Sequence, residues 1–193
     1  MFWQEAHRLD QLVTLEINSW NCTITDPIWS FFSDKLVWAP MYALIIALLI
    51  WRLGWKKGLV VLAAALLTFG FCDQFSNVVK YAVERIRPLN DEFMIANGLH
   101  VLENGGGYSF FSAHAANSFG LACSTYIGLR EDKRIRYRGY AGWMFFWASM
   151  VSISRIFVGK HYLGDVIVGI TIGTAAGIAF GLLARWVIHK YLH

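Results

Sequence analysis

Seven polar side chains in three short segments have the types and spacing that phosphate chemistry requires. They are Lys80 and Arg87 in the first segment, Ser112 and His114 in the second, and Arg155, His161 and Asp165 in the third. Arginine and lysine neutralise the charge of a phosphate group, and histidine can attack phosphorus or move a proton. The three segments together point to binding and transfer of a phosphoryl group.

The two histidines suit different tasks. Asp165 lies one helical turn after His161, so its carboxylate can accept a hydrogen bond from one ring nitrogen and leave the other free to attack. His114 has no carboxylate nearby in the sequence and is better suited to donate a proton. One neutral and one charged imidazole predict a bell-shaped dependence of activity on pH.

Two histidines and an aspartate are also metal ligands. However, Lys80, Arg87 and Arg155 would crowd the same place and repel a divalent cation. We therefore expect no metal at this site and no other cofactor. Two neighbouring basic residues, Arg85 and Lys160, are interpreted as solvated or headgroup-contacting side chains.

The composition indicates that lipid surrounds most of the chain. Of its 193 residues, 56% are hydrophobic and 16% are charged, whereas about a quarter are charged in soluble domains. Five apolar stretches are near the roughly 20 residues that a spanning helix needs. They are 36–53, 58–79, 112–129, 140–158 and 162–188.

The first 35 residues have a different pattern. Apolar side chains recur there at helical spacing among charged ones, as in a helix that lies on a membrane surface. A second short amphipathic helix is expected at 27–34, and residues 1–21 lack the apolar run of a cleavable signal peptide. The sequence predicts an all-α, polytopic transmembrane helix bundle at 36–188 that forms a single domain, 1–193, with the interfacial segment 1–35.

Basic residues set the expected orientation. They concentrate at 52–57, at 130–138 and near the C-terminus, which places these parts in the cytoplasm. The loop 88–111 and the three polar segments then lie on the other side. We expect a bacterial inner-membrane protein with its active site facing the periplasm and its C-terminus in the cytoplasm. The basic run 130–138 is interpreted as a topology signal, so no nucleic-acid partner is expected.

The last apolar stretch carries a row of glycines at intervals of four. They are Gly169, Gly173, Gly177 and Gly181. Small residues at this spacing allow two helices to approach closely. The row can pack within one chain or across a dimer, and we expect packing within one chain. The oligomeric state is left open.

The three polar segments resemble the signature of the type 2 phosphatidic acid phosphatase (PAP2) family, also called lipid phosphate phosphatases. That signature reads Lys-x6-Arg-Pro, Pro-Ser-Gly-His and Ser-Arg-x5-His. The first and third segments match at each defined position, and the order and membrane side match too. The second departs twice, because Phe111 replaces proline and Ala113 replaces glycine. The resemblance covers 80–165 by motif and all five stretches by topology.

The resemblance implies a role for each residue of the site. His161 would be the nucleophile that forms a phosphohistidine, and His114 would protonate the leaving group and later activate water. Phosphate would be bound by Lys80, Arg87, Ser112, Ala113 and Arg155, with Ala113 contributing its backbone N–H.

The expected function is hydrolysis of a phosphate monoester or diphosphate on an amphipathic lipid at the outer leaflet. The resemblance suggests undecaprenyl diphosphate, lipid A phosphate and phosphatidylglycerophosphate as substrates, and the bilayer is the other expected partner. Two alternatives stay open. The phosphohistidine could pass its phosphate to an acceptor hydroxyl, as in a phosphotransferase, or the chain could be a non-catalytic lipid-binding membrane protein, to which Phe111 and Ala113 would fit.

Overall fold

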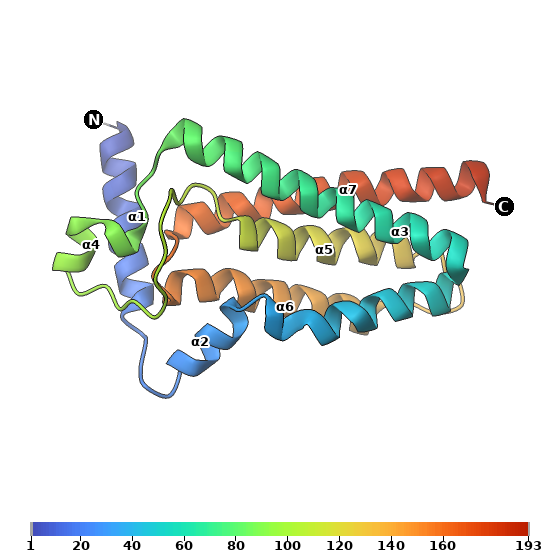
Figure 1. Cartoon of the computed structure of the whole chain (residues 1–193), viewed down its shortest axis with the longest axis horizontal. Coiled ribbons are helices and arrows are strands. Elements are labelled where there is room, and N and C mark those ends of the chain that lie inside the picture. The colour runs from blue at the N-terminus through green and yellow to red at the C-terminus, as the bar shows by residue number, and fades with distance from the viewer. Residues whose placement is uncertain (1, 193) are drawn as a thin grey trace.

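Long helices run side by side in this fold, and short helices cover one end of them. The computed structural model describes residues 2–192. Its elements are α1 (Phe2–Asn18), α2 (Asp26–Ser33), η1 (Leu36–Trp38), α3 (Ala39–Val83), η2 (Pro88–Asn90), α4 (Glu92–Ala96), α5 (Ala113–Leu129), α6 (Arg138–Phe157) and α7 (Leu163–Tyr191). Helices α3, α5, α6 and α7 follow one long axis, and α1 lies across its end (Figure 1). The predicted all-α class is confirmed, since the described residues form no strand.

Helix α3 consists of two arms joined at Gly54. Gly54 has φ +75° and ψ +161°, which glycine adopts without steric cost and other residues rarely adopt. The chain folds back there (Figure 1), so that a Cβ on Gly58 would lie 3.0 Å from the carbonyl oxygen of Leu49. The arms 39–53 and 55–83 correspond to the first two predicted spans.

The glycine row on α7 lets this helix approach α5 closely. A Cβ at Gly173 would lie 2.1 Å from the carbonyl oxygen of Ala116, and one at Gly177 would lie 2.5 Å from that of Gly120. The other two glycines of the row also face α5. A side chain at these positions would force the helices apart, so the row packs within one chain, as predicted.

Helix α1 is fastened to the end of the bundle by buried polar side chains. Thr14 and Asn18 are fully buried or nearly so. The amide nitrogen of the Asn18 side chain donates to the carbonyl oxygens of Ile156 at 3.1 Å and Phe157 at 3.2 Å. Leu9 on the outward face is exposed. This arrangement accounts for the apolar and polar pattern of the segment, whose position on a membrane surface stays a prediction.

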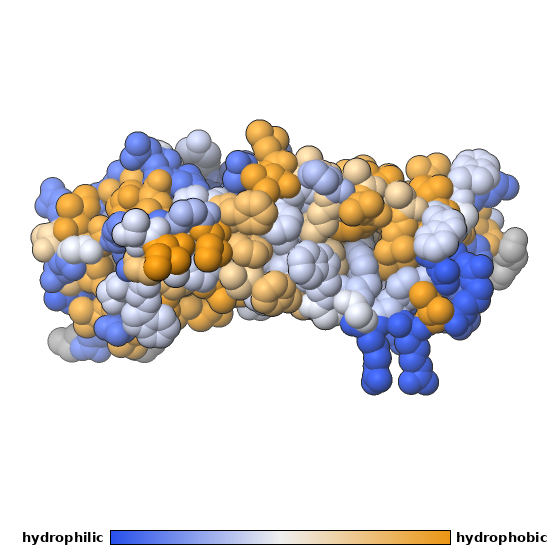
Figure 2. Space-filling model, turned by 90° about the horizontal axis from the view of Figure 1, so that it is seen from below, coloured by the Kyte–Doolittle hydropathy of each residue, from blue (hydrophilic) through white to orange (hydrophobic). Residues whose placement is uncertain are grey.

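Among the described residues, two segments are long and apolar enough to cross a membrane. They are Leu36–Val83 with 48 residues and Leu163–Tyr191 with 29 residues. The first consists of two arms, because it folds back at Gly54. Helices α5 and α6 lie where spans were predicted, but neither is both long and apolar enough to meet this criterion. Apolar side chains cover much of the middle of the molecule (Figure 2), and the number of crossings stays a prediction.

The basic loops lie together at the end of the bundle opposite α1 (Figure 1). The sequence predicted that they share one side of the membrane. Buried Asp132 accepts hydrogen bonds there from Arg52 Nη2 at 2.6 Å, Arg134 Nε at 2.9 Å and the Tyr137 hydroxyl at 2.6 Å. Glu131 pairs with basic side chains of α7. The loops and the end of α7 are therefore linked through ion pairs.

Candidate active site

The three polar segments meet at the end of the bundle next to α1. Each predicted residue lies at or near a helix end. Lys80 is in the last turn of α3, and Arg87 follows that helix. Ser112 precedes α5, and His114 lies in the first turn of α5. Arg155 is in the last turn of α6, His161 lies just before α7, and Asp165 lies in the first turn of α7. Residues far apart in the sequence are brought together because four helices end on the same side.

His161 is buried and faces the carboxylate of Asp165. Its Nδ1 lies 3.4 Å from Asp165 Oδ2, within ion-pair distance but not aligned as a hydrogen bond. Such contacts in free enzymes often tighten when the substrate binds. The same Oδ2 accepts a hydrogen bond from the backbone N of Tyr162 at 3.1 Å. The carboxylate is therefore on the Nδ1 side of the ring, which leaves Nε2 free to act as a nucleophile.

The surroundings of His161 favour its neutral form. Burial lowers the pKa of His161 to about 4 and outweighs the opposing effect of Asp165. The positive charges of Arg155 and Arg87 contribute to this lowering. At neutral pH the imidazole is therefore uncharged, which is the form able to attack phosphorus.

Two arginines at the site have hydrogen-bond donors without acceptors. The side chain of Arg155 is 3% exposed, and its Nη1 donates to the Ser33 hydroxyl and lies 3.9 Å from Glu103 Oε2. The Nε atoms of Arg155 and Arg87 are buried and have no hydrogen-bond partner among the described residues. Buried donors without acceptors are costly. Both guanidinium groups are thus prepared to bind an anion.

His114 and Lys80 lie near these groups. His114 is close enough to His161 and Arg155 to interact with them electrostatically. Lys80 is likewise close enough to interact electrostatically with Arg87. The arrangement places two imidazoles and three cationic side chains around one location, where a phosphoryl group could be bound and transferred.

The start of α5 is tied to the start of α7. Ser112 Oγ accepts a hydrogen bond from the backbone N of Ala115 at 3.4 Å, and the backbone N of Ser112 donates to the carbonyl oxygen of Asp165 at 3.0 Å. That amide is therefore occupied, whereas Ala113 opens the helix, whose N-terminus favours an anion. Phe111, which stands where the family has proline, is fully buried.

Arg85 and Lys160 are not the solvated side chains that the sequence predicted. Arg85 Nη1 donates to Asp165 Oδ1 at 2.7 Å, and Lys160 Nζ lies 2.5 Å from Oε2 of Glu103. Each side chain is less than one-fifth exposed. Sequence reasoning missed both ion pairs because the acidic partners are distant in the sequence and no local spacing connects them to these basic residues.

A cavity of about 470 Å³ opens beside His114. Its walls come from both arms of α3 and from α5 and α6, and most are apolar, with Tyr42, Leu49 and Trp147 among them. Polar side chains enter its lining from the site end, including Lys35 and His114. The cavity therefore connects the polar site to the apolar interior of the bundle.

Comparisons with known proteins show the family and the fold. The model of the PAP2 superfamily matches residues 58–189. A lipid A 4'-phosphatase from Bacteroides thetaiotaomicron is 35% identical over 180 residues, which cover 92% of this chain and 77% of the relative. A lipid A 4'-phosphatase from Porphyromonas gingivalis is 28% identical over 165 residues, covering 84% and 67%.

Two solved structures have a similar fold. The transmembrane PAP2-type phosphatidylglycerolphosphate phosphatase from Bacillus subtilis aligns with a TM-score of 0.69 at 18% identity, covering 97% of this chain and 88% of that one. Aquifex aeolicus LpxE aligns with a TM-score of 0.63 at 22% identity, covering 87% and 92%. At these identities the likeness concerns the fold.

Proposed function

The chain belongs to the PAP2 superfamily and is a membrane lipid phosphatase, and on that premise we propose that it hydrolyses a phosphate ester of lipid A through a phosphohistidine on His161. One observation carries the mechanism. A buried, neutral His161 that faces Asp165 lies among arginines whose buried Nε donors have no acceptor in the described part of the chain.

The cationic side chains bind the phosphate group in this proposal. Arg87 and Arg155 can each direct two N–H groups at phosphate oxygens, and Lys80 contributes a point charge. The N-terminus of α5 adds backbone donors. These groups neutralise the charge that would otherwise repel a nucleophile, and they hold phosphorus in line with the attacking nitrogen.

In the first step, Nε2 of His161 attacks phosphorus. A nitrogen–phosphorus bond forms as the bond from phosphorus to the lipid oxygen breaks. His114, which holds a proton once the bound phosphate offsets the neighbouring positive charges, gives it to that oxygen. Asp165 accepts a hydrogen bond from Nδ1–H and stabilises the positive charge that develops on the ring.

In the second step, water replaces His161 on phosphorus. His114, now neutral, takes a proton from the water as its oxygen bonds to phosphorus and the nitrogen–phosphorus bond breaks. Inorganic phosphate leaves, His161 returns to its neutral form and His114 is again protonated.

Two observations support lipid A as the substrate. Both sequence relatives described above are lipid A 4'-phosphatases. The apolar cavity beside His114 can accept an acyl chain while the phosphate stays at the polar end. The basic loops at the opposite end support an inner-membrane location with the site facing the periplasm.

The test is phosphate release from lipid substrates by the purified protein in detergent micelles. We expect release from lipid A to exceed release from phosphatidylglycerophosphate and undecaprenyl diphosphate. His161→Ala should lower it by about 10³-fold or more, because the nucleophile is lost. With ³²P-labelled lipid, the wild-type protein should carry acid-labile, base-stable label that His161→Ala lacks.

His189→Ala serves as the matched control, because His189 lies at the opposite end of the bundle and pairs with Glu131. Its phosphate release should equal that of the wild type. Unchanged release by His161→Ala would refute the mechanism. Phosphate that appears only on an added acceptor, and not free in solution, would indicate a phosphotransferase.

A further inference from the structure

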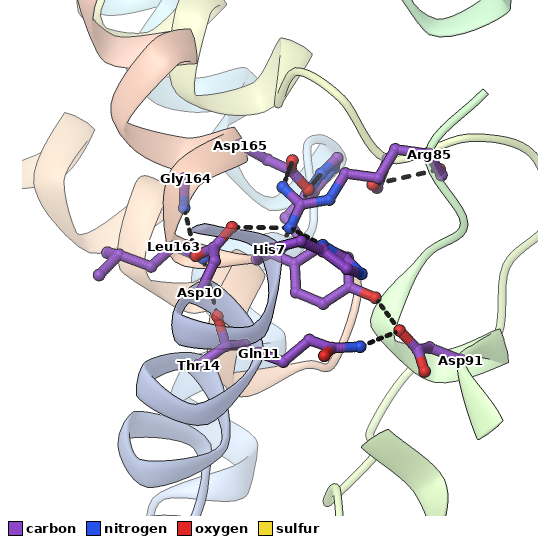
Figure 3. A network of polar contacts seen from close by, with 12 residues as sticks. His7, Asp10, Gln11, Thr14, Arg85, Asp91, Leu163, Gly164 and Asp165 are labelled. Carbon is purple, nitrogen blue, oxygen red and sulfur yellow. Dashed lines mark hydrogen bonds and ion pairs between the residues drawn. The ribbon is translucent and has the colours of Figure 1, made fainter. Parts of the chain in front are cut away.

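The Asp165 carboxylate contacts Arg85, which follows α3 (Figure 3), and the residues just before its own helix. Its Oδ1 accepts a hydrogen bond from Arg85 Nη1 at 2.7 Å, while its Oδ2 faces the Tyr162 backbone N and His161 Nδ1. Asp165 is fully buried. Because the two oxygens have different partners, the carboxylate cannot rotate without losing one of them.

Arg85 is itself fixed on several sides. Its Nη2 donates to Asp10 Oδ2 at 2.7 Å and lies 3.1 Å from His7 Nδ1. Its guanidinium carbon lies 3.8 Å from the centroid of the Tyr162 ring, and its carbonyl oxygen accepts a hydrogen bond from the Ser109 N at 2.8 Å. A planar guanidinium can join two carboxylates and stack on a ring at once, whereas an ammonium group cannot.

Helix α1 also caps the first turn of α7, on which Asp165 lies (Figure 3). Asp10 Oδ1 accepts a hydrogen bond from the Gly164 N at 2.9 Å, and Thr14 Oγ1 accepts one from the Leu163 N at 3.0 Å. A Cβ on Gly164 would lie 2.7 Å from Asp10 Oδ2, so a larger residue there would displace the Asp10 carboxylate. Asp10 therefore contacts both the backbone of α7 and the guanidinium that holds Asp165.

We propose that Arg85 is a positioning residue for phosphoryl transfer, which fixes the Asp165 carboxylate so that Oδ2 faces Nδ1 of His161, and that Asp10 of α1 fixes Arg85 in turn. This inference rests on the proposed role of His161 as the nucleophile. It makes Asp10 of α1 part of the support of the active site, acting through Arg85.

Arg85 has two effects in this arrangement. It holds the carboxylate where His161 needs it during attack, and it compensates part of the negative charge that the imidazole experiences. The other charged or titratable groups that face the pair from packed elements are His7 and Asp10 on α1, Lys80 on α3, Arg87 after α3, His114 on α5 and Arg155 on α6. Of the basic groups, Arg85 donates a hydrogen bond to the carboxylate itself.

The experiment compares Arg85→Ala, Arg85→Lys and Asp10→Asn with the wild type, with lipid A as substrate. Arg85→Ala should lower kcat by about 100-fold with KM nearly unchanged, because a nucleophile out of position loses rate rather than binding. The acid limb of kcat/KM should move to higher pH, since the uncompensated carboxylate raises the pKa of His161. Arg85→Lys should recover part of the rate, and Asp10→Asn should show a smaller loss in the same direction.

Arg8→Ala is the matched control on α1, because Arg8 stacks on Phe93 and not on Asp165. It should retain wild-type kcat and the wild-type pH profile. The inference is overturned if Arg85→Ala keeps wild-type kcat. It is also overturned if all three variants lose activity without any change in the acid limb and Arg85→Lys recovers nothing. An inactive His161→Ala beside a fully active Arg85→Ala would refute this inference alone, whereas an active His161→Ala would refute the proposed function.

Discussion

The Asp132 cluster at one end of the helix bundle and the pair Arg87 and Arg155 at the other differ in how fully their hydrogen bonds are satisfied. At the end with the basic loops, both oxygens of Asp132 accept hydrogen bonds from arginine, and the Tyr137 hydroxyl donates to one of them. At the end covered by α1, the Nε atoms of Arg155 and Arg87 are buried without a hydrogen-bond partner among the described residues. The charged groups around Asp132 are paired within the protein. Arg155 and Arg87 each keep a buried donor that has no acceptor among the described residues.

This difference separates a structural cluster from a functional one. A buried cation that keeps a free donor costs stability, and it persists where a ligand supplies the acceptor. A fully paired cluster offers nothing to a ligand. The number of basic residues is therefore a poor guide to function in this protein, and the satisfaction of their hydrogen bonds is a better one.

The largest effect is expected for Arg155→Ala. We predict a loss of about 10³-fold in kcat for phosphate release, because a charged donor aimed at the phosphate disappears. The Tm should change little, since the guanidinium that is removed was incompletely paired. Measuring both on the same preparation tests the comparison. A large fall in Tm with retained activity would mean that Arg155 stabilises the fold and does not bind phosphate.

The pH dependence comes next in size. His161 must be neutral to attack, and burial lowers its pKa to about 4, so kcat/KM should fall about tenfold per pH unit below that value. It should stay high as the pH rises from there. A pH–rate profile of the free enzyme measures this. An acid midpoint near 6.5, the ordinary value for histidine, would mean that His161 is not buried as described.

The smallest effect on activity is expected for Asp132→Ala. Hydrogen bonds from Arg134 and Tyr137 hold the pKa of this carboxyl below its ordinary range, so it is ionised at neutral pH and joins the loops of the basic end. Its removal should lower Tm by roughly 5 °C, because Arg52 and Arg134 lose their shared partner. Phosphate release measured below the melting range should match the wild type. A loss like that of Arg155→Ala would show that the two ends are not distinct.

Much of the fold could be predicted from the sequence because the signals are local. Apolar stretches gave the positions of α3, α5, α6 and α7, and the glycine row gave a close helix contact whose partner, α5, only the structure identifies. The family resemblance from three short segments is confirmed by the match to the PAP2 superfamily. The i, i+4 spacing of His161 and Asp165 anticipated their contact, although His161 lies just before α7 and not on the helix.

The second layer of the site could not be predicted in the same way. Arg85, Asp10 and Glu103 carry no local pattern that assigns a partner to any of them. Arg85 meets Asp165 because the end of α3 and the start of α7 lie side by side, and Asp10 joins them because α1 crosses that end of the bundle.

The sequence by itself determined which side chains are available for phosphate chemistry, their order, and the apolar helices that carry them to one end. Helical periodicity and hydropathy are patterns among neighbouring residues, so they can be recognised in the amino-acid sequence alone. The tertiary structure decided which acid faces which base and which donors remain free. Many of those facts depend on contacts between segments 54 to 154 residues apart in the chain, where packing alone sets the distance.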